Sequence, residues 1–318
     1  MYRTRGVAGG APSRPLLAGV LPVALFASGH TFFVTRMAHV MGRTPFMVHT
    51  TFQYGGTEGK RHRLREGMMW EDDAAYYDQP FLTYTPDIPF ELVYPSGNAS
   101  VRPDGSVPFR RRMTVEQHFR LVHHQLTQIR DALALAQSLG RILVLPRLVC
   151  GLDRYWAPHQ GIIPGSSTEL PLLECPADHV IDLEHLVGRR PEEILREHTM
   201  LCNPRMKREV LASRRAVGFA GEAATAAAVE AARVAHASIR ILHVDGPLPS
   251  WRKVLPAGPR RKSFKDTIRH YGSLWCCNMP PGGRGPGHIW YDFLHDLVPH
   301  LDRHNRKWTT PWKPIMGP

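Results

Sequence analysis

The sequence has no long hydrophobic run and few cysteines. Within its 318 residues, no apolar stretch reaches the roughly 18 residues that a membrane-spanning helix needs, which excludes an integral membrane bundle. Five cysteines are too few for a disulfide-rich scaffold, and none of them forms the Cys-x-x-Cys pair typical of zinc sites. There is also no internal repeat, heptad pattern or block of like charges. What remains is a globular chain that must fold around a hydrophobic core.

The chain does contain enough apolar residues for such a core, together with an excess of positive charge. Hydrophobic residues make up 43% and charged residues 21%, which excludes global disorder. The length suits two domains of roughly 150 residues or one large domain. Forty Lys and Arg against 28 Asp and Glu give a net charge of +12, which favours an anionic partner: nucleic acid, a membrane surface or a phosphorylated small molecule. Because the cations are scattered and match no known nucleic-acid motif, we expect no nucleic-acid partner.

The apolar stretch at residues 15–29 can be interpreted in two ways. It resembles a secretory signal in length, and three arginines precede it (Arg3, Arg5 and Arg14). However, Pro22 interrupts the stretch, and no small-x-small cleavage site follows it. The alternative is a buried strand over residues 18–26 that leads into a turn at residues 28–30.

The clearest local signal is an amphipathic helix. Apolar residues step by four and three along one face, at Val115, Phe119, Val122, Leu126, Ile129, Leu133 and Ala136. Thr114 and Gln117 form a capping box, and Gly140 stands where the helix should end.

Apolar strands are expected to alternate with helices along the rest of the chain. The run RILVLP (141–146) suits a strand that is buried on both faces, and an Ala-rich helical stretch (219–236) precedes a second candidate strand at 238–244. HVIDL (179–183) is a third candidate. This alternation predicts a parallel sheet and an α/β fold.

The most unusual segment, residues 47–66, combines glycines with cations. A β-leaning run ends at Gln53, and Gly55, Gly56 and Gly59 then free the backbone. Four cations and a histidine lie close behind (Lys60, Arg61, His62, Arg63 and Arg65). Glycines let a backbone approach phosphate oxygens and Lys or Arg neutralise their charge, so the segment predicts a phosphate-binding loop. A solvated basic turn is the plainer alternative.

Several segments resemble plant and green-algal arabinosyltransferases of glycosyltransferase family 77, which modify extensin-type wall glycoproteins. The matching segments are LPVALFASGHTFFV, HTTFQYGGTEGKRHRLREGM, HFRLVHHQLTQIRDALALAQSLGRILVLPRLVCGLDRYW, CPADHVIDLEHL, YGSLWCC and GHIWYDF. They follow the family order from about residue 16 to 295 and favour the strand over the signal peptide near the N-terminus.

The resemblance implies the fold class and domain boundaries. We expect the C-terminal part of a GT-A-like nucleotide-diphospho-sugar transferase domain at residues 16–93 and a linker at 94–113. A Rossmann-like α/β domain is expected at 114–295. Residues 1–15 would be a flexible N-terminus and residues 296–318 a tail.

The resemblance also implies a divalent metal, Mn²⁺ or Mg²⁺, that binds the donor diphosphate. Family members supply an Asp-x-Asp for it, but this sequence contains none, and Asp182-Leu183-Glu184 imitates it only weakly. We therefore expect the chain to lack the donor-binding half. His49 is the candidate metal ligand, although a structural histidine is the alternative.

The remaining site residues follow from the same resemblance. Lys60, Arg61 and Arg65 are the expected donor-diphosphate contacts, and Thr50 and Gln53 are expected to orient the sugar. Further sugar or acceptor contacts are expected in the second block, at Asp153, Arg154 and Trp156. Packing of Tyr155 and Trp156 is the alternative there, and for Arg130 an ion pair with a neighbouring acid is favoured over a phosphate contact.

The resemblance implies the Golgi lumen, where disulfides persist, and an N-terminal anchor that holds full-length relatives in the Golgi membrane and that we expect to be missing from this chain. A Cys150–Cys175 bridge is our first interpretation, with a zinc site as the alternative. Adjacent Cys276 and Cys277 are expected to bond elsewhere.

The resemblance implies a retaining glycosyltransferase. It would move a pentose, L-arabinofuranose, from a UDP-sugar donor to a hydroxyproline-rich glycoprotein or its arabinoside chain, with no catalytic residue assigned. The alternative is a non-catalytic glycan-binding or scaffolding module, which the missing Asp-x-Asp favours.

Overall fold

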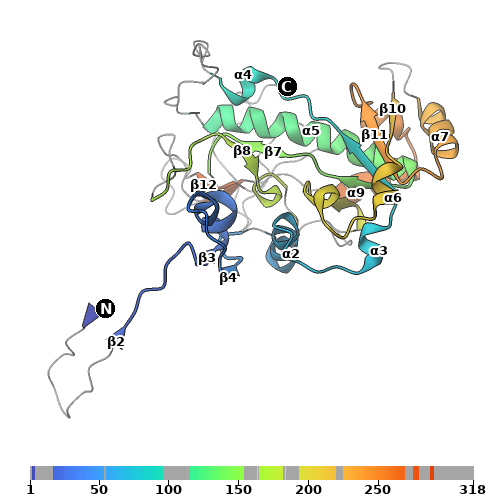
Figure 1. The fold of residues 1–318 in the computed structure, drawn as a ribbon. Coiled ribbons are helices and arrows are strands. Elements are labelled where there is room, and N and C mark those ends of the chain that lie inside the picture. The colour runs from blue at the N-terminus through green and yellow to red at the C-terminus, as the bar shows by residue number, and fades with distance from the viewer. Residues whose placement is uncertain are drawn as a thin grey trace, which may run out of the picture.

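The computed structural model shows an α/β fold around a parallel sheet of five strands (Figure 1). It describes residues 2–3, 17–53, 55–95, 113, 115–153, 163, 165–181, 183, 193–219, 225–268, 275–278 and 287–289. The strands are β1 (Tyr2–Arg3), β2 (Leu17–Ala18), β3 (Phe26–Ser28), β4 (Met47–His49), β5 (Phe81–Tyr84), β6 (Ile142–Val144), β7 (Leu148–Cys150), β8 (Leu172–Cys175), β9 (Leu195–Arg196), β10 (Arg215–Gly218), β11 (Ile241–Asp245), β12 (Trp275–Asn278) and β13 (Gly287–Ile289). The α-helices are α1 (Met37–Val40), α2 (Gly56–Glu66), α3 (Ala74–Tyr77), α4 (Phe90–Val93), α5 (Val115–Leu139), α6 (Arg208–Ala212), α7 (Ala226–Ala235), α8 (Trp251–Val254) and α9 (Pro259–Ile268). Shorter helical turns are η1 (His30–Val34), η2 (Ala177–His179) and η5 (Met200–Cys202).

The main sheet has the strand order β10-β11-β5-β6-β9, and every neighbouring pair is parallel. Strand β5 lies at its centre, with Phe81 opposite Ile142 on one side and Ile241 on the other. All four residues of β5 are buried, as expected for a strand covered on both faces. The predicted α/β class with a parallel sheet is confirmed.

The sheet contradicts the predicted separation into two domains. Strand β5 lies before the expected linker at 94–113, yet it pairs with β6 and β11, which lie after it. A strand buried on both faces can satisfy its backbone hydrogen bonds only between two neighbours, so the segments 16–93 and 114–295 share one sheet. Most of the linker, residues 96–112, lies outside the described residues, as does the expected tail.

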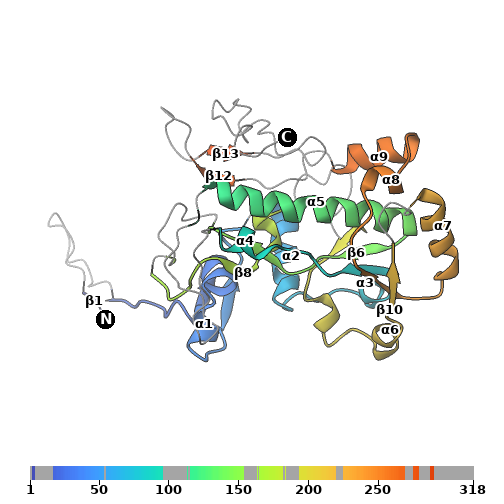
Figure 2. The ribbon, with the colours of Figure 1, turned by 90° about the horizontal axis from the view of Figure 1, so that it is seen from above.

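Helix α5 confirms the predicted amphipathic helix, and it lies along one face of the sheet (Figures 1 and 2). Its predicted apolar face is buried at Val122, Leu126, Ile129 and Leu133. The helix ends as expected at Gly140, whose φ of +65° suits a left-handed C-terminal glycine. Thr114, the expected cap, lies outside the described residues.

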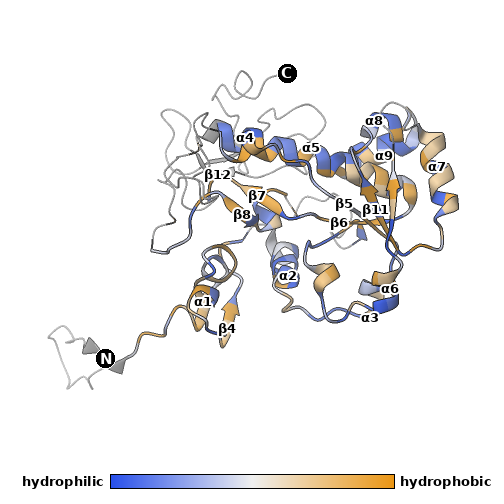
Figure 3. Cartoon of the chain, turned by 45° about the horizontal axis from the view of Figure 1, so that its top comes forward, coloured by the Kyte–Doolittle hydropathy of each residue, from blue (hydrophilic) through white to orange (hydrophobic). Residues whose placement is uncertain are grey.

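The run 141–146 forms the buried strand β6, the run 238–244 forms most of β11, and the Ala-rich stretch contains α7. In Figure 3 the strands of the main sheet carry the orange of apolar residues, whereas α2 is largely blue. Among the described residues, no helix combines the length and apolar character needed to cross a bilayer.

Two strand predictions are wrong. The stretch 18–26 forms a turn, because the Pro22 carbonyl accepts hydrogen bonds from the backbone of Leu25 and Phe26, and β3 begins only at Phe26. Val20 is 82% exposed, so this stretch is not buried. The stretch 179–183 follows the helical turn η2, and Val180 and Ile181 reach the core from that turn without joining a strand.

Candidate functional site

The segment with the glycines and cations forms helix α2, where the sequence predicted a loop. Gly55 and Gly56 adopt φ angles of 90° and 54°, which allow the chain to turn sharply between β4 and the helix. Gly55 at the N-cap has no side chain to cap the first turn, and the Gln53 amide donates to the carbonyl of Gly56 at 3.1 Å. An uncapped helix start after a glycine turn presents free backbone N–H groups, which favour an anion.

The expected diphosphate contacts do not share one environment. Lys60 is exposed, and Arg61 donates to Glu58 Oε2 at 3.1 Å, within reach of the helix start. Arg65 lies in the last turn, about 13 Å further along the axis than Gly56. It is buried and donates to both carboxylate oxygens of Asp72, at 2.8 and 2.5 Å. The structure therefore does not support a diphosphate contact at Arg65.

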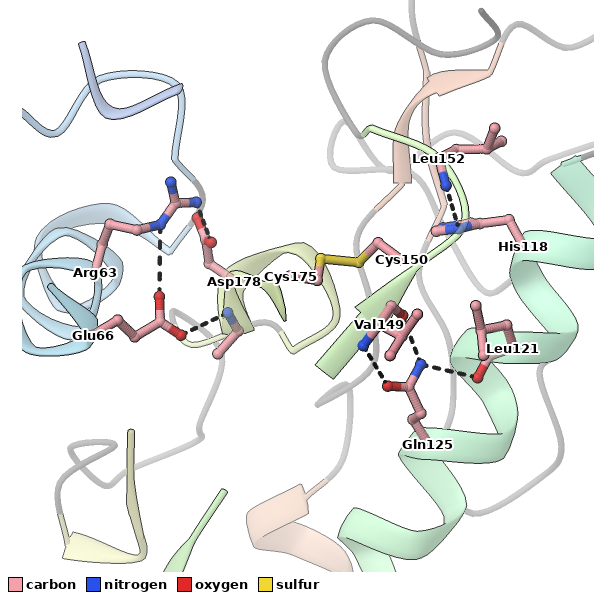
Figure 4. Close-up of a disulfide and its surroundings, with 11 residues drawn as sticks. Arg63, Glu66, His118, Leu121, Gln125, Val149, Cys150, Leu152, Cys175 and Asp178 are labelled. Carbon is pink, nitrogen blue, oxygen red and sulfur yellow. Dashed lines mark hydrogen bonds and ion pairs between the residues drawn. A yellow bond between two sulfur atoms is a disulfide. The ribbon is translucent and has the colours of Figure 1, made fainter. Parts of the chain in front are cut away.

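Arg63, which no prediction singled out, is the most deeply buried cation of α2. It is 1% exposed, donates to Asp178 Oδ1 of η2, and packs its guanidinium over the ring of Phe33. A buried charge is tolerated only with a partner, so the pair with Asp178 anchors α2 to η2. Figure 4 shows this pair.

Glu66 completes the buried end of α2. Its Oε1 accepts a hydrogen bond from the Ala177 backbone at 2.8 Å and lies 3.7 Å from His62 Nε2 and 3.9 Å from His198 Nδ1. Burial raises the pKa of Glu66 to about 8, although Arg63 opposes the shift. Burial, followed by the charge of Arg65, lowers the pKa of His62 to about 3. At neutral pH this carboxyl group therefore holds its proton and the imidazole of His62 is neutral.

A cavity of about 100 Å³ opens beside this carboxyl group, and we call it the Glu66 pocket. Its lining residues are Phe32, Phe33, Arg36, His39, Glu66, Gly67, Glu174, Pro176 and His198. His198 lies two residues beyond β9, at the carboxyl edge of the parallel sheet, which is where open α/β sheets bind ligands. His198 Nε2 lies 3.5 Å from Glu174 Oε1, and Arg36 donates to Glu174 Oε2 at 2.7 Å.

The Glu66 pocket offers hydrogen-bond donors and acceptors against an aromatic wall. Protonated Glu66 can donate, the carboxyl group of Glu174 can accept, and Phe32 and Phe33 supply an apolar face. That combination suits a small polyhydroxylated ring, which has hydroxyl groups at its edge and C–H groups on its face. Burial lowers the pKa of His198, which keeps its imidazole neutral beside Glu174.

His49 and Thr50 do not converge with other ligands. His49 is exposed at the end of β4, and Thr50 is buried where the backbone passes Gly29. Among the described residues, the one group of three potential metal ligands is Cys150, Cys175 and His179, and its two cysteines are joined to each other. The residues around His49 therefore do not fit a metal site by themselves. Asp182 and Glu184 lie outside the described residues.

The expected sugar contacts of the second block are only partly described. Asp153 is fully buried, and its Oδ2 lies 3.0 Å from His30 Nε2, so it ties the N-terminal segment to the loop after β7 and offers no surface to a sugar. Arg154 and Trp156 lie outside the described residues. Arg130 bonds to its neighbour Asp131 at 2.9 Å, which confirms the favoured ion pair.

The predicted disulfide is confirmed. Cys150 at the end of β7 and Cys175 at the end of β8 are bonded, with a Cα–Cα distance of 5.6 Å (Figure 4). Three residues after the bridge comes Asp178, the partner of Arg63. The disulfide thus fixes the turn that holds α2. Cys202 is free and exposed, and the side chains of Cys276 and Cys277 lie outside the described part of the structure.

Glu66, Glu174 and His198 were not predicted from the sequence. One signal was present: Glu66 follows His62 and Arg63 at helical spacing of four and three residues, but that spacing counts only once the segment is recognised as a helix. His198 and Glu174 come from distant segments, and no local pattern links them to α2.

Comparison with known proteins supports the resemblance found in the motifs. No protein-family model matches the chain, and no solved structure matches it. The chain is 35% identical to Arabinosyltransferase XEG113 of Arabidopsis thaliana over 94% of its own length and 46% of that protein. It therefore spans about half the length of the curated relative that it matches, and the resemblance to a plant arabinosyltransferase is confirmed.

Proposed function

From its likeness to an arabinosyltransferase, we propose that this chain takes part in glycosyl transfer. It would move L-arabinofuranose from a UDP-linked donor to a hydroxyproline-rich glycoprotein or to its growing arabinoside chain. The observation that carries this proposal is the 35% identity over nearly the whole chain. The disulfide between Cys150 and Cys175 supports an oxidising compartment, which agrees with the Golgi lumen.

The start of α2 is the proposed contact for the donor diphosphate. Gly55 and Gly56 leave room for a close approach, and Gly55 at the N-cap provides no side-chain cap to compete with a ligand. Lys60 is exposed, and Arg61 would exchange Glu58 for a phosphate. Arg65 is not part of this proposal because its guanidinium already donates hydrogen bonds to Asp72.

The Glu66 pocket is the proposed subsite for a sugar ring. Glu66 and Glu174 would bind hydroxyl groups, and Phe32 and Phe33 would lie against the ring. The pocket is small, so it would take part of one sugar and orient it. In a retaining transferase with departure and attack on one face, such orientation suffices and no separate catalytic base is needed, so we name none.

The resemblance implies Mn²⁺ or Mg²⁺, which would neutralise the leaving diphosphate. The described residues do not provide its ligand set, since His49 has no converging carboxylates among them. Any metal would need ligands from elsewhere, and we derive no step through it.

A second candidate is a glycan-binding or scaffolding module without turnover. Two observations favour it: the sequence lacks an Asp-x-Asp, and His49 stands apart from other ligands in the described residues. Release of UDP from UDP-arabinofuranose by the full chain with Mn²⁺ separates the two candidates. Turnover supports the transferase, whereas binding of arabinoside oligomers without turnover supports the module.

The donor contact is tested by binding of UDP. The double variant Lys60→Gln with Arg61→Gln should weaken binding about tenfold, because it removes two charged contacts to the diphosphate. The matched control is Arg208→Gln with Arg214→Gln, which removes the same charge at exposed positions elsewhere. Equal affinity for both variants would contradict the proposed contact.

A further inference from the structure

A second cationic region lies on helices α8 and α9. Residues 251–268 contain six cations and one acid, Asp266. We call the cations the α8–α9 surface: Arg252, Lys253, Arg260, Arg261, Lys262 and Lys265. Four are exposed, and Arg261 and Lys265 are half-buried.

These cations rest on a fixed base. Arg261 donates to the carbonyls of Leu255 and Arg252, at 2.5 and 2.6 Å, which joins α9 to α8. Beneath them, Trp251 and Phe264 are buried with ring centroids 6.0 Å apart. Within the described residues, none of the six cations forms an ion pair with a carboxylate. Arg252 and Arg261 also stack over the Trp251 ring, at 5.3 and 5.7 Å, so these two are held in place and the charges of the other four cations are left available.

A cavity of about 760 Å³ lies beside this surface, between α7, the end of α5 and the α8–α9 connection. Figure 2 shows these helices gathered at one end of the molecule. The cavity lining includes Arg233, Arg260 and Ser138 together with apolar side chains such as Val229 and Val254. It is large enough for a monosaccharide unit or more.

The charge at the rim of this cavity is positive. Arg233 hydrogen-bonds Glu230 and lowers the pKa of that carboxyl group, and Arg260 adds to the shift. Two guanidinium groups thus act on one carboxylate, and the remaining cations of α9 have none. Ser138 Oγ is buried in the wall without a hydrogen-bond partner among the described residues.

This cavity is distinct from the Glu66 pocket. Its lining includes Gly140, which precedes β6, so it lies at the amino edge of the parallel sheet. His198 of the Glu66 pocket follows β9 at the carboxyl edge. The two sites therefore lie at opposite ends of the parallel strands, one at the amino ends and the other at the carboxyl ends.

The distribution of charge restricts the ligand. The α9 cations lie within about 8 Å along the helix axis but leave it in different directions, because successive residues turn by about 100° around the axis. One phosphate group cannot contact all of them, so the ligand should carry several anionic groups. Trp251 and Phe264 are buried, and the surface exposes no aromatic side chain on which nucleic-acid bases could stack. It also exposes no large apolar side chain in residues 251–268 that could enter a membrane.

We propose that the α8–α9 surface and the adjoining cavity bind an acidic polysaccharide with repeated uronate carboxylates. The carboxylates would pair with Arg260, Lys262 and Lys265, and one sugar ring would enter the cavity. The choice of a glycan rests on the proposed function, whereas the need for several anionic groups rests on the geometry alone. The site would hold the protein on an acidic glycan while the Glu66 pocket, at the other end of the strands, binds its own sugar ring.

The test measures binding of polygalacturonate oligomers to the full chain by calorimetry, with a neutral arabinan oligomer of equal length as control ligand. The triple variant Arg260→Gln, Lys262→Gln and Lys265→Gln should bind about tenfold more weakly than wild type. The control variant Arg43→Gln, Arg208→Gln and Arg214→Gln removes the same charge at other exposed positions and should bind as wild type does. A circular dichroism spectrum identical to wild type shows that each variant is folded.

Three outcomes would overturn the proposal. These are the absence of polygalacturonate binding by wild type, an equal loss in both triple variants, and equally tight binding of a single-stranded RNA oligomer that the first variant also weakens. UDP-arabinofuranose turnover is measured separately on the same proteins. Turnover without polygalacturonate binding would sink only this inference, and binding without turnover would sink only the transferase proposal.

Discussion

Helices α2 and α9 carry the same density of positive charge and use it in opposite ways. Each has four cations within six residues, at 60–65 and at 260–265. In α2, three of them meet carboxylates: Arg61 meets Glu58, and the two buried arginines meet Asp178 and Asp72. In α9, no cation forms an ion pair with a carboxylate within the described residues, although Arg260 helps to lower the pKa of Glu230, and all remain at least partly exposed.

The difference teaches that cation density alone does not reveal an anion-binding site. Arg63 pairs with an acid 115 positions away in the sequence, and the pair is buried between α2 and η2. Such a pair is structural because removing one partner leaves a charge without water or counter-charge. The cations of α9 have no such buried partner among the described residues, so their charges are accessible to an anionic ligand.

The strongest way to break this comparison is to remove the counter-charge of Arg63. Asp178→Asn keeps the shape of the side chain but removes the main counter-charge of the guanidinium, leaving only Glu66 Oε2, 3.9 Å from Arg63 Nε, so we expect a loss of about 3 kcal/mol in unfolding free energy. Urea unfolding monitored by fluorescence measures it. The matched control is Asp266→Asn in α9, which should change stability by less than about 0.5 kcal/mol. Equal, small effects of both would show that the α2 cluster is not a buried ionic core.

The disulfide sharpens the comparison because it fixes η2, and through it Asp178. The double variant Cys150→Ser with Cys175→Ser should lose about 3 kcal/mol, since the bridge closes a loop of 25 residues in the unfolded chain. The exposed free thiol provides a control, and Cys202→Ser should leave the unfolding midpoint unchanged. A double variant as stable as wild type would mean that η2 is held without the bridge.

Glu66 predicts a pH dependence that the other helix does not share. Its pKa is raised to about 8, so its stabilising protonated form is fully present below the unfolded value and is lost as pH rises towards 8. The stability of Glu66→Gln relative to wild type should therefore increase between about pH 5 and pH 8, by at most about 1.4 kcal/mol per pH unit. Unfolding curves at several pH values measure this difference.

Glu230, in α7 beside α9, should give a pH dependence of stability with the opposite sign to that of Glu66. Hydrogen bonding from Arg233 lowers its pKa, so its contribution to stability is lost as pH falls through the acid range. Glu230→Gln should therefore differ from wild type in its pH dependence only below about pH 5.

For the buried carboxyl group, a constant difference in stability between Glu66→Gln and wild type at every pH would contradict the assignment of a protonated Glu66.

The smallest effect on stability is expected from replacing the cations of α9. The triple variant Arg260→Gln, Lys262→Gln and Lys265→Gln should unfold within about 0.5 kcal/mol of wild type, because these side chains make no ion pair that holds the described fold together. The midpoint of thermal unfolding of the triple variant, compared with that of wild type, measures this difference in stability. A loss as large as that of Asp178→Asn would reveal that these cations have structural partners.

Local patterns in the sequence were enough to predict α5, β6 and β11. The apolar face of α5 repeats at helical spacing, Gly140 ends it, and β6 follows as an apolar run beside a proline. The same reasoning failed for α2, because its glycines and cations resemble a loop in isolation. That helix is held by tertiary partners, above all Asp178, and not by its own apolar face.

The candidate site was predictable only in part. The sequence pointed to the segment 47–66 and to the Cys150–Cys175 bridge, but not to the Glu66 pocket, where Glu66 meets a histidine 132 residues later. No spacing rule connects residues that are brought together only when β9 joins the sheet. The central place of β5 was missed for the same reason, since its neighbours β6 and β11 lie far along the chain.

The contrast between the two helices is tested most directly by arginine modification with a dicarbonyl reagent on the native protein, followed by peptide mapping. We predict rapid modification of Arg252 and Arg260, whereas Arg63 and Arg65 should react only after unfolding. Modification of Arg63 at the rate of Arg260 in the folded protein would contradict the account, because it would show that the cations of α2 are as available to a ligand as those of α9.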